Sequence, residues 1–275
     1  MYIEDLAAST FTSQCLKRDP PRPMHLVRKT PIEASSSIID VLLDDPVSQK
    51  CVVELEVGRY DEEDVQRVQL PLTSYLEWLK DGSEQGKMGG KQVYLAQWRG
   101  LEEIPSLKRF LGPPNFLQSI MDVGKADLYQ ASFFVGASGA TTPLHYDPYS
   151  NIFRMVSTSG SMSAKHFLLL PPTPKITSYV KRPDNEGFLK NTSPIDFVLH
   201  GDLEAGDVAS VNVTQGSPSQ SYIDVIGKEA MSLILKEGEM LYLPERWWHH
   251  VQNIGSSKGW TAGVGYWFRS RQGSV

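Results

Sequence analysis

The second half of the chain alternates between short apolar runs and turn residues. From residue 128 onward, segments rich in β-branched and aromatic residues follow one another, separated by turns such as GASGATTP and STSGSMSA. This pattern is typical of an antiparallel sandwich or barrel of the jelly-roll kind. The expected strands cover residues 128–136, 143–147, 151–156, 165–172, 231–236, 239–244, 249–254 and 260–268.

The first half mixes helical and strand patterns. The runs IIDVLL (38–43) and SYLEWLKDG (74–82) space their apolar residues as helices do, whereas CVVELEVG (51–58) and VYLAQW (93–98) predict strands. Residues 1–24 are polar and end in DPPRP, which favours an N-terminal arm. We therefore expect an arm (1–24), an α+β region packing on the barrel (25–127) and a mainly β domain with flanking helices (128–275). Residues 181–222 break the strand pattern and predict an insertion carried on the barrel.

Composition narrows the class of protein further. The 275 residues are 40% hydrophobic and 21% charged, as in folded globular proteins, and the net charge of −5 gives no basic field for nucleic acid. No apolar run approaches the roughly 20 residues that span a membrane. The two cysteines and the acidic N-terminal residues predict an intracellular protein of the cytoplasm or nucleus.

The sharpest chemical signal is TTPLHYD (141–147). On a strand, His145 and Asp147 lie on one face, and an imidazole with a carboxylate makes two thirds of a facial iron(II) site. Six histidines and 32 acidic residues give about 0.7 such pairs by chance, so a surface pair near a turn is the competing interpretation. A third ligand is available from EGEMLYLPERWWHHV (237–251), where His249 and His250 are both candidates.

Three segments together resemble a known family. HYDPYSNIF, KHFLLLPP and EGEMLYLPERWWHHVQN are similar to the Jumonji-C (JmjC) iron- and 2-oxoglutarate-dependent oxygenases, especially their small hydroxylases. The likeness extends upstream through VELEVGRYDEED (53–64) and YLAQW (94–98). The resemblance implies a double-stranded β-helix of the cupin-like kind, with Fe(II) as cofactor and 2-oxoglutarate and O₂ as co-substrates.

The resemblance also implies roles for individual residues. It favours His249 over its neighbour His250 as the third metal ligand, because the family's ligand directly follows the aromatic residue. For the co-substrate it implies roles for Lys165 and Tyr94, among others. The alternative to such a role is a purely structural one: a solvated strand end for Lys165 and a core aromatic residue for Tyr94. Gly265 stands where the family's asparaginyl hydroxylase has a polar residue, which puts one co-substrate hydrogen bond in doubt. The implied metal ligands are His145, Asp147 and His249, and the implied co-substrate residues are Tyr94, Thr142, Asn151 and Lys165.

The expected activity is hydroxylation of a protein or peptide side chain, with arginine or lysine as the preferred target. Two alternatives stay open: lysine demethylation, and a non-redox metal-binding cupin or a catalytically silent binding module. Demethylation requires a site for a methylated ammonium, and aromatic residues that could form one are Tyr149, Trp247, Trp248 and Trp267. The sequence does not indicate the oligomeric state.

Overall fold

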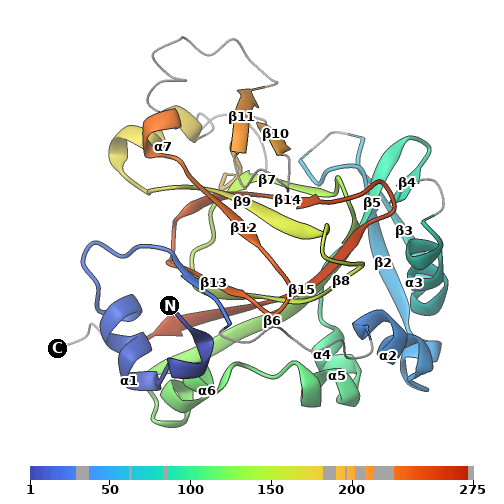
Figure 1. The fold of residues 1–275 in the computed structure, drawn as a ribbon, viewed down its shortest axis with the longest axis horizontal. Helices are drawn as coiled ribbons and strands as arrows, with labels where there is room; N and C mark the ends of the chain where they lie inside the picture. The colour runs from blue at the N-terminus through green and yellow to red at the C-terminus, as the bar shows by residue number, and fades with distance from the viewer. Residues whose placement is uncertain are drawn as a thin grey trace.

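Two antiparallel sheets face each other and enclose a barrel (Figure 1). The computed structural model describes residues 1–28, 37–61, 64–82, 86–181, 190–195, 197–201, 208–213 and 226–271. The larger sheet runs in the order β1 (Met24–Leu26), β13 (Met240–Leu243), β8 (Ser150–Thr158), β15 (Trp260–Ser270), β6 (Ala126–Ala137), β5 (Lys91–Trp98), β2 (Val52–Val57) and β3 (Gln66–Pro71), with β4 (Lys87–Met88) beside β5. The smaller sheet runs in the order β12 (Met231–Leu235), β9 (Ala164–Leu170), β14 (Trp248–Ile254) and β7 (Thr141–His145).

The strand order is that of a double-stranded β-helix, which confirms the predicted fold class. Strands β6 to β9 alternate between the larger and the smaller sheet, and β12 to β15 return with the same alternation. Some predicted boundaries are wrong: the strand expected over 165–172 ends at Leu170, and the strand expected over 143–147 ends at His145. Asp147 precedes a proline, which has no N–H for a strand ladder, and its carbonyl accepts a hydrogen bond from the Arg246 N–H at 2.8 Å instead.

The helices of the first half of the chain pack against the outside of the larger sheet and at its ends, whereas α7 (Pro174–Val180) packs on the smaller sheet. The predicted helix near residues 74–82 is confirmed as α3, which ends at Gly82 with a left-handed φ of 66°. The predicted helix at IIDVLL is α2, capped by the Ser37 hydroxyl. The helices are η1 (Ile3–Asp5), α1 (Ala8–Phe11), η2 (Thr12–Leu16), α2 (Ile38–Asp44), η3 (Ser48–Lys50), α3 (Leu72–Asp81), α4 (Gly100–Glu103), α5 (Pro105–Phe110), α6 (Asn115–Asp122) and α7 (Pro174–Val180).

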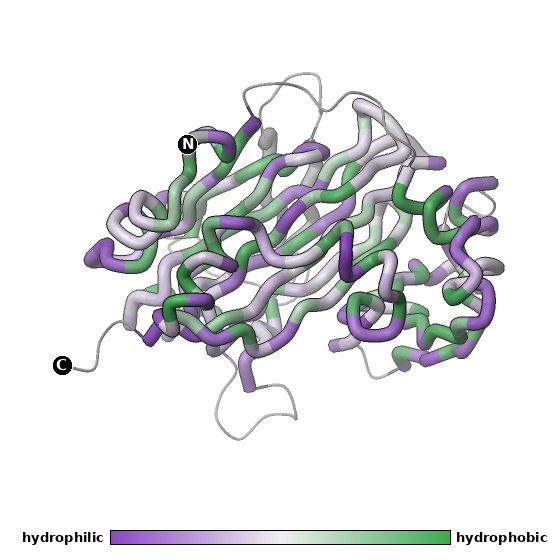
Figure 2. The backbone as a smooth tube through the Cα atoms, turned by 90° about the horizontal axis from the view of Figure 1, so that it is seen from below, coloured by the Kyte–Doolittle hydropathy of each residue, from purple (hydrophilic) through white to green (hydrophobic). Residues whose placement is uncertain are grey.

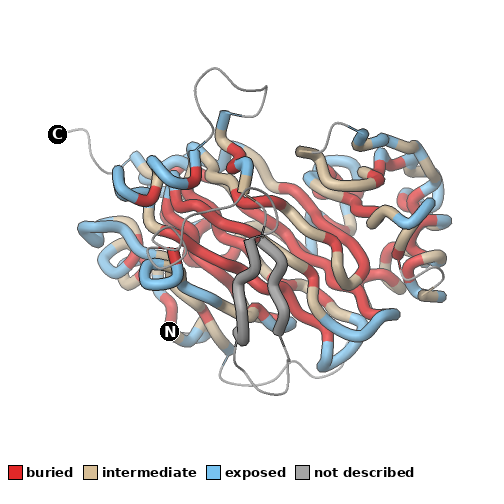
Figure 3. Tube along the Cα trace, turned by 90° about the horizontal axis from the view of Figure 1, so that it is seen from above, coloured by how far each residue is buried: buried red, intermediate tan, exposed pale blue. Residues whose placement is uncertain are grey.

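Hydrophobic residues recur along the chain (Figure 2), and the strands of the barrel are largely buried (Figure 3). Their buried apolar side chains form three clusters. The largest lies between the larger sheet and its helices. The second fills the barrel interior and contains Phe134, Phe153 and Phe167. The third lies between the smaller sheet and α7 and contains Trp248. Within the described ranges, no helix has the length and apolar character needed to cross a bilayer.

Residues 1–24 differ from the extended arm expected from their polarity. They form the short helices η1, α1 and η2, because Phe11 and Cys15 are fully buried in the main core and anchor them there. The segment then reaches the barrel, where the Trp247 indole N–H donates to the Pro21 carbonyl at 3.1 Å. The division of the chain into arm, α+β region and barrel stays a prediction.

The predicted insertion lies only partly within the described residues. Its strands β10 (Phe197–Gly201) and β11 (Val208–Val213) form a separate antiparallel pair. Thr192 bridges to His145, and the Ser193 N–H donates to the Leu144 carbonyl at 2.7 Å. This part of the insertion therefore extends the smaller sheet beside β7, at the strand that carries the first candidate ligand.

Candidate metal centre and co-substrate pocket

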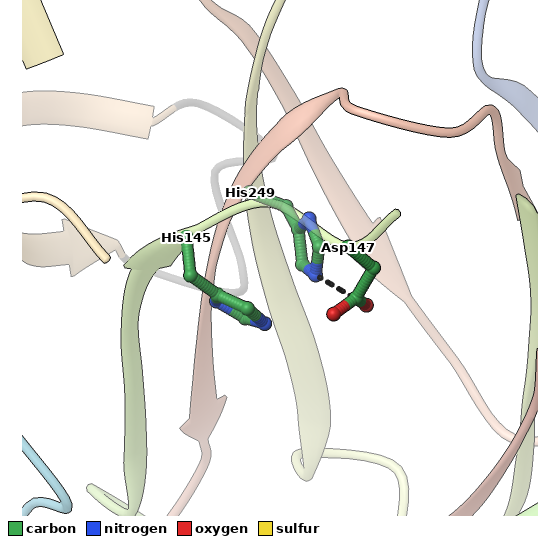
Figure 4. A group of neighbouring side chains, drawn as sticks. All are labelled: His145, Asp147 and His249. Carbon is green, nitrogen blue, oxygen red and sulfur yellow. Dashed lines mark ion pairs between the residues drawn. The ribbon is translucent and has the colours of Figure 1, made fainter. Parts of the chain in front are cut away.

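Three candidate ligands converge at the end of β7. The antiparallel register of β7 and β14 sets His145 directly opposite His249, and their ring centroids are 4.1 Å apart. Asp147 follows two residues after the strand, and its Oδ2 lies 3.7 Å from Nε2 of His249 (Figure 4). One donor atom from each of the three residues lies within 4.8 Å of the others. Both imidazoles and the carboxylate thus face a common point.

Backbone carbonyls fix the proton position on both histidines. Nδ1 of His145 lies 2.8 Å from the Pro143 carbonyl, and Nδ1 of His249 lies 3.0 Å from the Trp247 carbonyl. A carbonyl oxygen only accepts, so both Nδ1 atoms carry hydrogen, and in the neutral tautomer that this favours the lone pair is on Nε2. Burial and the neighbouring His145 lower the pKa of His249 to about 4, which keeps its imidazole in the neutral, metal-binding form.

Trp267 orients the carboxylate of this group. Its indole N–H donates to Asp147 Oδ2 at 2.8 Å. A Cβ atom at Gly265 would come within 2.9 Å of the Trp267 ring, so glycine at this position leaves the indole its place. Gly265 thus provides no polar side chain for the co-substrate, but it leaves room for the Trp267 indole, which donates a hydrogen bond to the candidate metal ligand Asp147.

His250, the rival for the third place, lies on the other face of β14. Its Cα partner in β9 is Leu168, which belongs to the cluster between the smaller sheet and α7. Alternation along the strand therefore separates it from His249. Burial lowers the pKa of His250 to about 3, as expected of an imidazole within the protein interior.

The predicted co-substrate residues gather around a buried lysine. Lys165 is 1% exposed, and its Nζ donates to Tyr94 Oη at 3.2 Å and to Asn253 Oδ1 at 2.5 Å. Thr142 lies beside Tyr94, where it opposes the rise that burial causes in the pKa of the phenol. The solvated strand end that was the alternative for Lys165 is wrong, because the side chain is buried in the barrel. Among the described residues no carboxylate pairs with this ammonium, and desolvation lowers its pKa to about 7.

Asn151 lies apart from these contacts. It is 4% exposed on β8, and its Oδ1 accepts no hydrogen bond from the described residues. A Cβ atom at Gly265 would lie 3.4 Å from its Nδ2, so Asn151 adjoins the space beside Trp267. A buried acceptor of this kind fits a site that a polar ligand completes.

A cavity of about 480 Å³ opens beside the candidate ligands. His145, Asp147 and Thr142 form one part of its lining, and Glu56 and Tyr60 form another. Burial raises the pKa of Glu56, Arg67 opposes that shift, and Glu54 adds to it. The cavity therefore joins the candidate metal centre to a carboxylate that a cation would stabilise.

Several residues of the site were missed by the sequence reasoning. Glu56 and Tyr60 belong to VELEVGRYDEED, a segment already noted for its resemblance, so a signal was present. Asn253 lies four residues after His249 on β14, on the same face, and strand alternation alone could have identified it. Thr192, whose hydroxyl lies 3.2 Å from Tyr60 Oη, comes from the insertion and had no signal.

Comparison with known proteins identifies the family. The chain belongs to the cupin-like domain family, which matches residues 15–274, and its relatives carry JmjC names, which confirms the resemblance. It is 28% identical over 176 residues to Jumonji C domain-containing protein 5 of Drosophila melanogaster, covering 64% of this chain and 37% of that protein.

Two further relatives carry different activities in their names. Lysine-specific demethylase JMJ30 of Arabidopsis thaliana is 28% identical over 176 residues, with 64% of this chain and 33% of the relative covered. The bifunctional peptidase and (3S)-lysyl hydroxylase JMJD7 of Homo sapiens is 28% identical over 144 residues, with 50% and 40% covered. The matches thus span about a third to two fifths of each relative's length.

Trp267→Phe tests the hydrogen bond to Asp147. The variant keeps an aromatic ring but removes the indole donor, so we expect the affinity for Fe(II) or Co(II) to fall about tenfold. Anaerobic metal titration measures this affinity, and thermal unfolding of the metal-free protein serves as the folding control. An unchanged metal affinity in a folded variant would show that Trp267 does not orient Asp147.

Lys165 predicts a pH dependence of anion binding. Above its pKa of about 7 the free side chain is mostly neutral, and a bound dicarboxylate favours the protonated form. We therefore expect 2-oxoglutarate binding to take up a proton in this range and to weaken as the pH rises. Calorimetry in buffers of different ionisation enthalpy measures the uptake, and Lys165→Met should abolish it. Equal uptake by this variant would assign the proton to another group.

Proposed function

We propose that this protein is an Fe(II)- and 2-oxoglutarate-dependent dioxygenase that hydroxylates a side chain of a protein or peptide. The observation that carries the proposal is the convergence of two imidazoles and a carboxylate beside one cavity, which His145 and Asp147 line. Thr142 shares that cavity with His145 and lies beside Tyr94, whose hydroxyl accepts a hydrogen bond from the buried Lys165. A metal site and a site for an anionic co-substrate are thereby contiguous.

The donor set fits iron(II). Two imidazole nitrogens and one carboxylate form the facial arrangement of non-haem iron oxygenases, which leaves positions for other ligands. When bound there, iron supplies the oxidation chemistry that couples O₂ and 2-oxoglutarate to substrate hydroxylation. The protein's own part is to hold the ligands through Nδ1 and indole hydrogen bonds and to exclude water with the aromatic residues of the barrel.

Lys165 is the group that suits the distal carboxylate of 2-oxoglutarate. A carboxylate buried in the barrel needs a cation and hydrogen-bond donors, and Lys165 with Tyr94 offers both. A cupin without redox chemistry has no need of this buried cation. The buried lysine therefore favours an oxygenase over the non-redox alternative.

The acidic part of the cavity favours a basic target residue. Glu56 lies in the same cavity as His145 and Asp147, and burial raises the pKa of its carboxyl even though Arg67, on the same cavity wall, opposes that shift. An arginine or lysine side chain entering the cavity would add a positive charge beside this buried carboxylate. This supports a basic protein substrate, with which the net charge of −5 is compatible.

The positions of four aromatic side chains favour hydroxylation over demethylation. Trp247 packs in the barrel interior, whereas Trp248 packs on the opposite side of the smaller sheet. Tyr149 stacks on Tyr129 with ring centroids 4.3 Å apart, and Trp267 donates to Asp147. These four residues do not gather into one cage for a methylated ammonium. Lysine demethylation stays the second candidate, because relatives such as JMJ30 are named lysine-specific demethylases.

Single alanine variants test the ligand assignment. Replacing His145, Asp147 or His249 by alanine should abolish iron binding and turnover, because each removes one of three donors. His250→Ala should retain iron, since its imidazole lies on the other face of β14. The iron content of each variant, measured after anaerobic reconstitution, decides whether His249 or His250 is the third ligand. Iron retained by His249→Ala and lost by His250→Ala would reverse the assignment.

Basic peptides test both the reaction and the role of Glu56. The loaded enzyme should add one oxygen atom to an unmethylated arginine or lysine peptide, detected by mass spectrometry. Glu56→Gln should raise KM for that peptide about tenfold or more by removing a charge-assisted contact. Glu54→Gln is the matched control: this carboxylate lines the same cavity, but it is half-exposed and already pairs with Arg67 at 3.4 Å.

Two outcomes would contradict these expectations. Release of formaldehyde from a methylated peptide, without oxygen addition to the unmethylated one, would identify a demethylase. Equal effects of the Glu54 and Glu56 variants on KM would show that Glu56 does not recognise the basic side chain.

A further inference from the structure

Asn253 holds the buried lysine of the co-substrate pocket in place. Its side-chain oxygen accepts a hydrogen bond from Lys165 Nζ at 2.5 Å, and Asn253 itself is 1% exposed. Its Nδ2 group donates to the carbonyls of Gly136 and Ala137, at 3.0 and 3.1 Å. Both hydrogens of the amide are therefore bound to β6, and its oxygen faces the ammonium.

The orientation of the amide follows from this network. If the side chain were flipped, its NH₂ group would face the Lys165 ammonium and its oxygen would face two carbonyl oxygens. Both contacts would then be repulsive, so only one orientation satisfies every group. Two main-chain hydrogen bonds also hold Asn253 in place: its N–H donates to the Ala140 carbonyl, and its carbonyl accepts from the Gly139 N–H.

The surroundings of Lys165 leave its charge without a counter-ion. Besides Asn253 and Tyr94, its Nζ faces the rings of Tyr94 and Phe153, at 5.4 and 5.7 Å from their centroids. Within the described part of the chain no acidic side chain pairs with it. An amide oxygen orients the ammonium but does not neutralise it. The positive charge is therefore still available to an incoming anion.

We propose that Asn253 is a positioning residue of the co-substrate site, which holds the Lys165 ammonium un-neutralised for the distal carboxylate of a dicarboxylic 2-oxo acid. The inference rests on the proposed function and adds to it the source of the preference for a dicarboxylate. A carboxylate at position 253 would form an internal ion pair with Lys165 and repel the co-substrate. Alanine would leave the ammonium without one of its acceptors and free to move.

The test compares two 2-oxo acids that differ only in the distal carboxylate. Binding of 2-oxoglutarate and of 2-oxobutyrate is measured by calorimetry on the Mn(II)-loaded protein without turnover. Wild type should prefer 2-oxoglutarate. Asn253→Asp should lower its affinity about a hundredfold, leave 2-oxobutyrate nearly unchanged and keep the affinity for Mn(II). Asn253→Ala should give a smaller loss of the same preference.

Gln252→Glu is the matched control. It also adds one negative charge to β14, but on the opposite face of the strand, so the preference for 2-oxoglutarate should persist. A dicarboxylate preference retained by Asn253→Asp and by Asn253→Ala would overturn the positioning role. A merely structural role would lower the melting temperature and weaken both acids equally. Wild type that does not prefer 2-oxoglutarate would instead overturn the co-substrate of the proposed function, and the inference with it.

Discussion

The antiparallel pairing of β7 with β14 is the interaction on which the site depends. It sets His145 opposite His249, although more than a hundred residues separate them in the chain. Backbone carbonyls of the same two segments then bind both Nδ1 atoms, so the backbone orients each imidazole and favours the tautomer with hydrogen on Nδ1. Asp147 joins them only because the strand stops at His145 and the chain turns back toward β14.

A buried positive charge is the second constraint. Burying an ammonium without a counter-ion in the barrel interior costs free energy. The hydrogen-bond partners of Lys165 there are uncharged: the amide of Asn253 and the phenol of Tyr94. The same burial strengthens its attraction for an anion that enters the pocket. The free protein therefore carries the free-energy cost of desolvating Lys165, and the attraction between its ammonium and a bound dicarboxylate would offset that cost.

The sequence predicted the barrel well because its strands alternate and its turns are marked by glycine and serine. The candidate metal ligands were also predictable, since their types and spacing limit the chemistry, and the resemblance favoured His249 over His250. Contacts between distant segments were not predictable. The hydrogen bond from Trp267 to Asp147 depends on the space that Gly265 leaves for the indole ring. The local sequence around these residues does not indicate how their side chains pack. The helices of residues 3–16 were missed because Phe11 and Cys15 find their partners only in the folded core.

The most direct test of the account is an anaerobic titration of the Fe(II)-loaded protein with 2-oxoglutarate, followed by visible absorption. Chelation of the metal by the 2-oxo acid should produce a metal-to-ligand charge-transfer band that requires both iron and 2-oxoglutarate. The account predicts that band for the wild type and its loss in Asp147→Ala. Tight iron binding without the band, at saturating 2-oxoglutarate, would contradict it and identify a non-redox cupin.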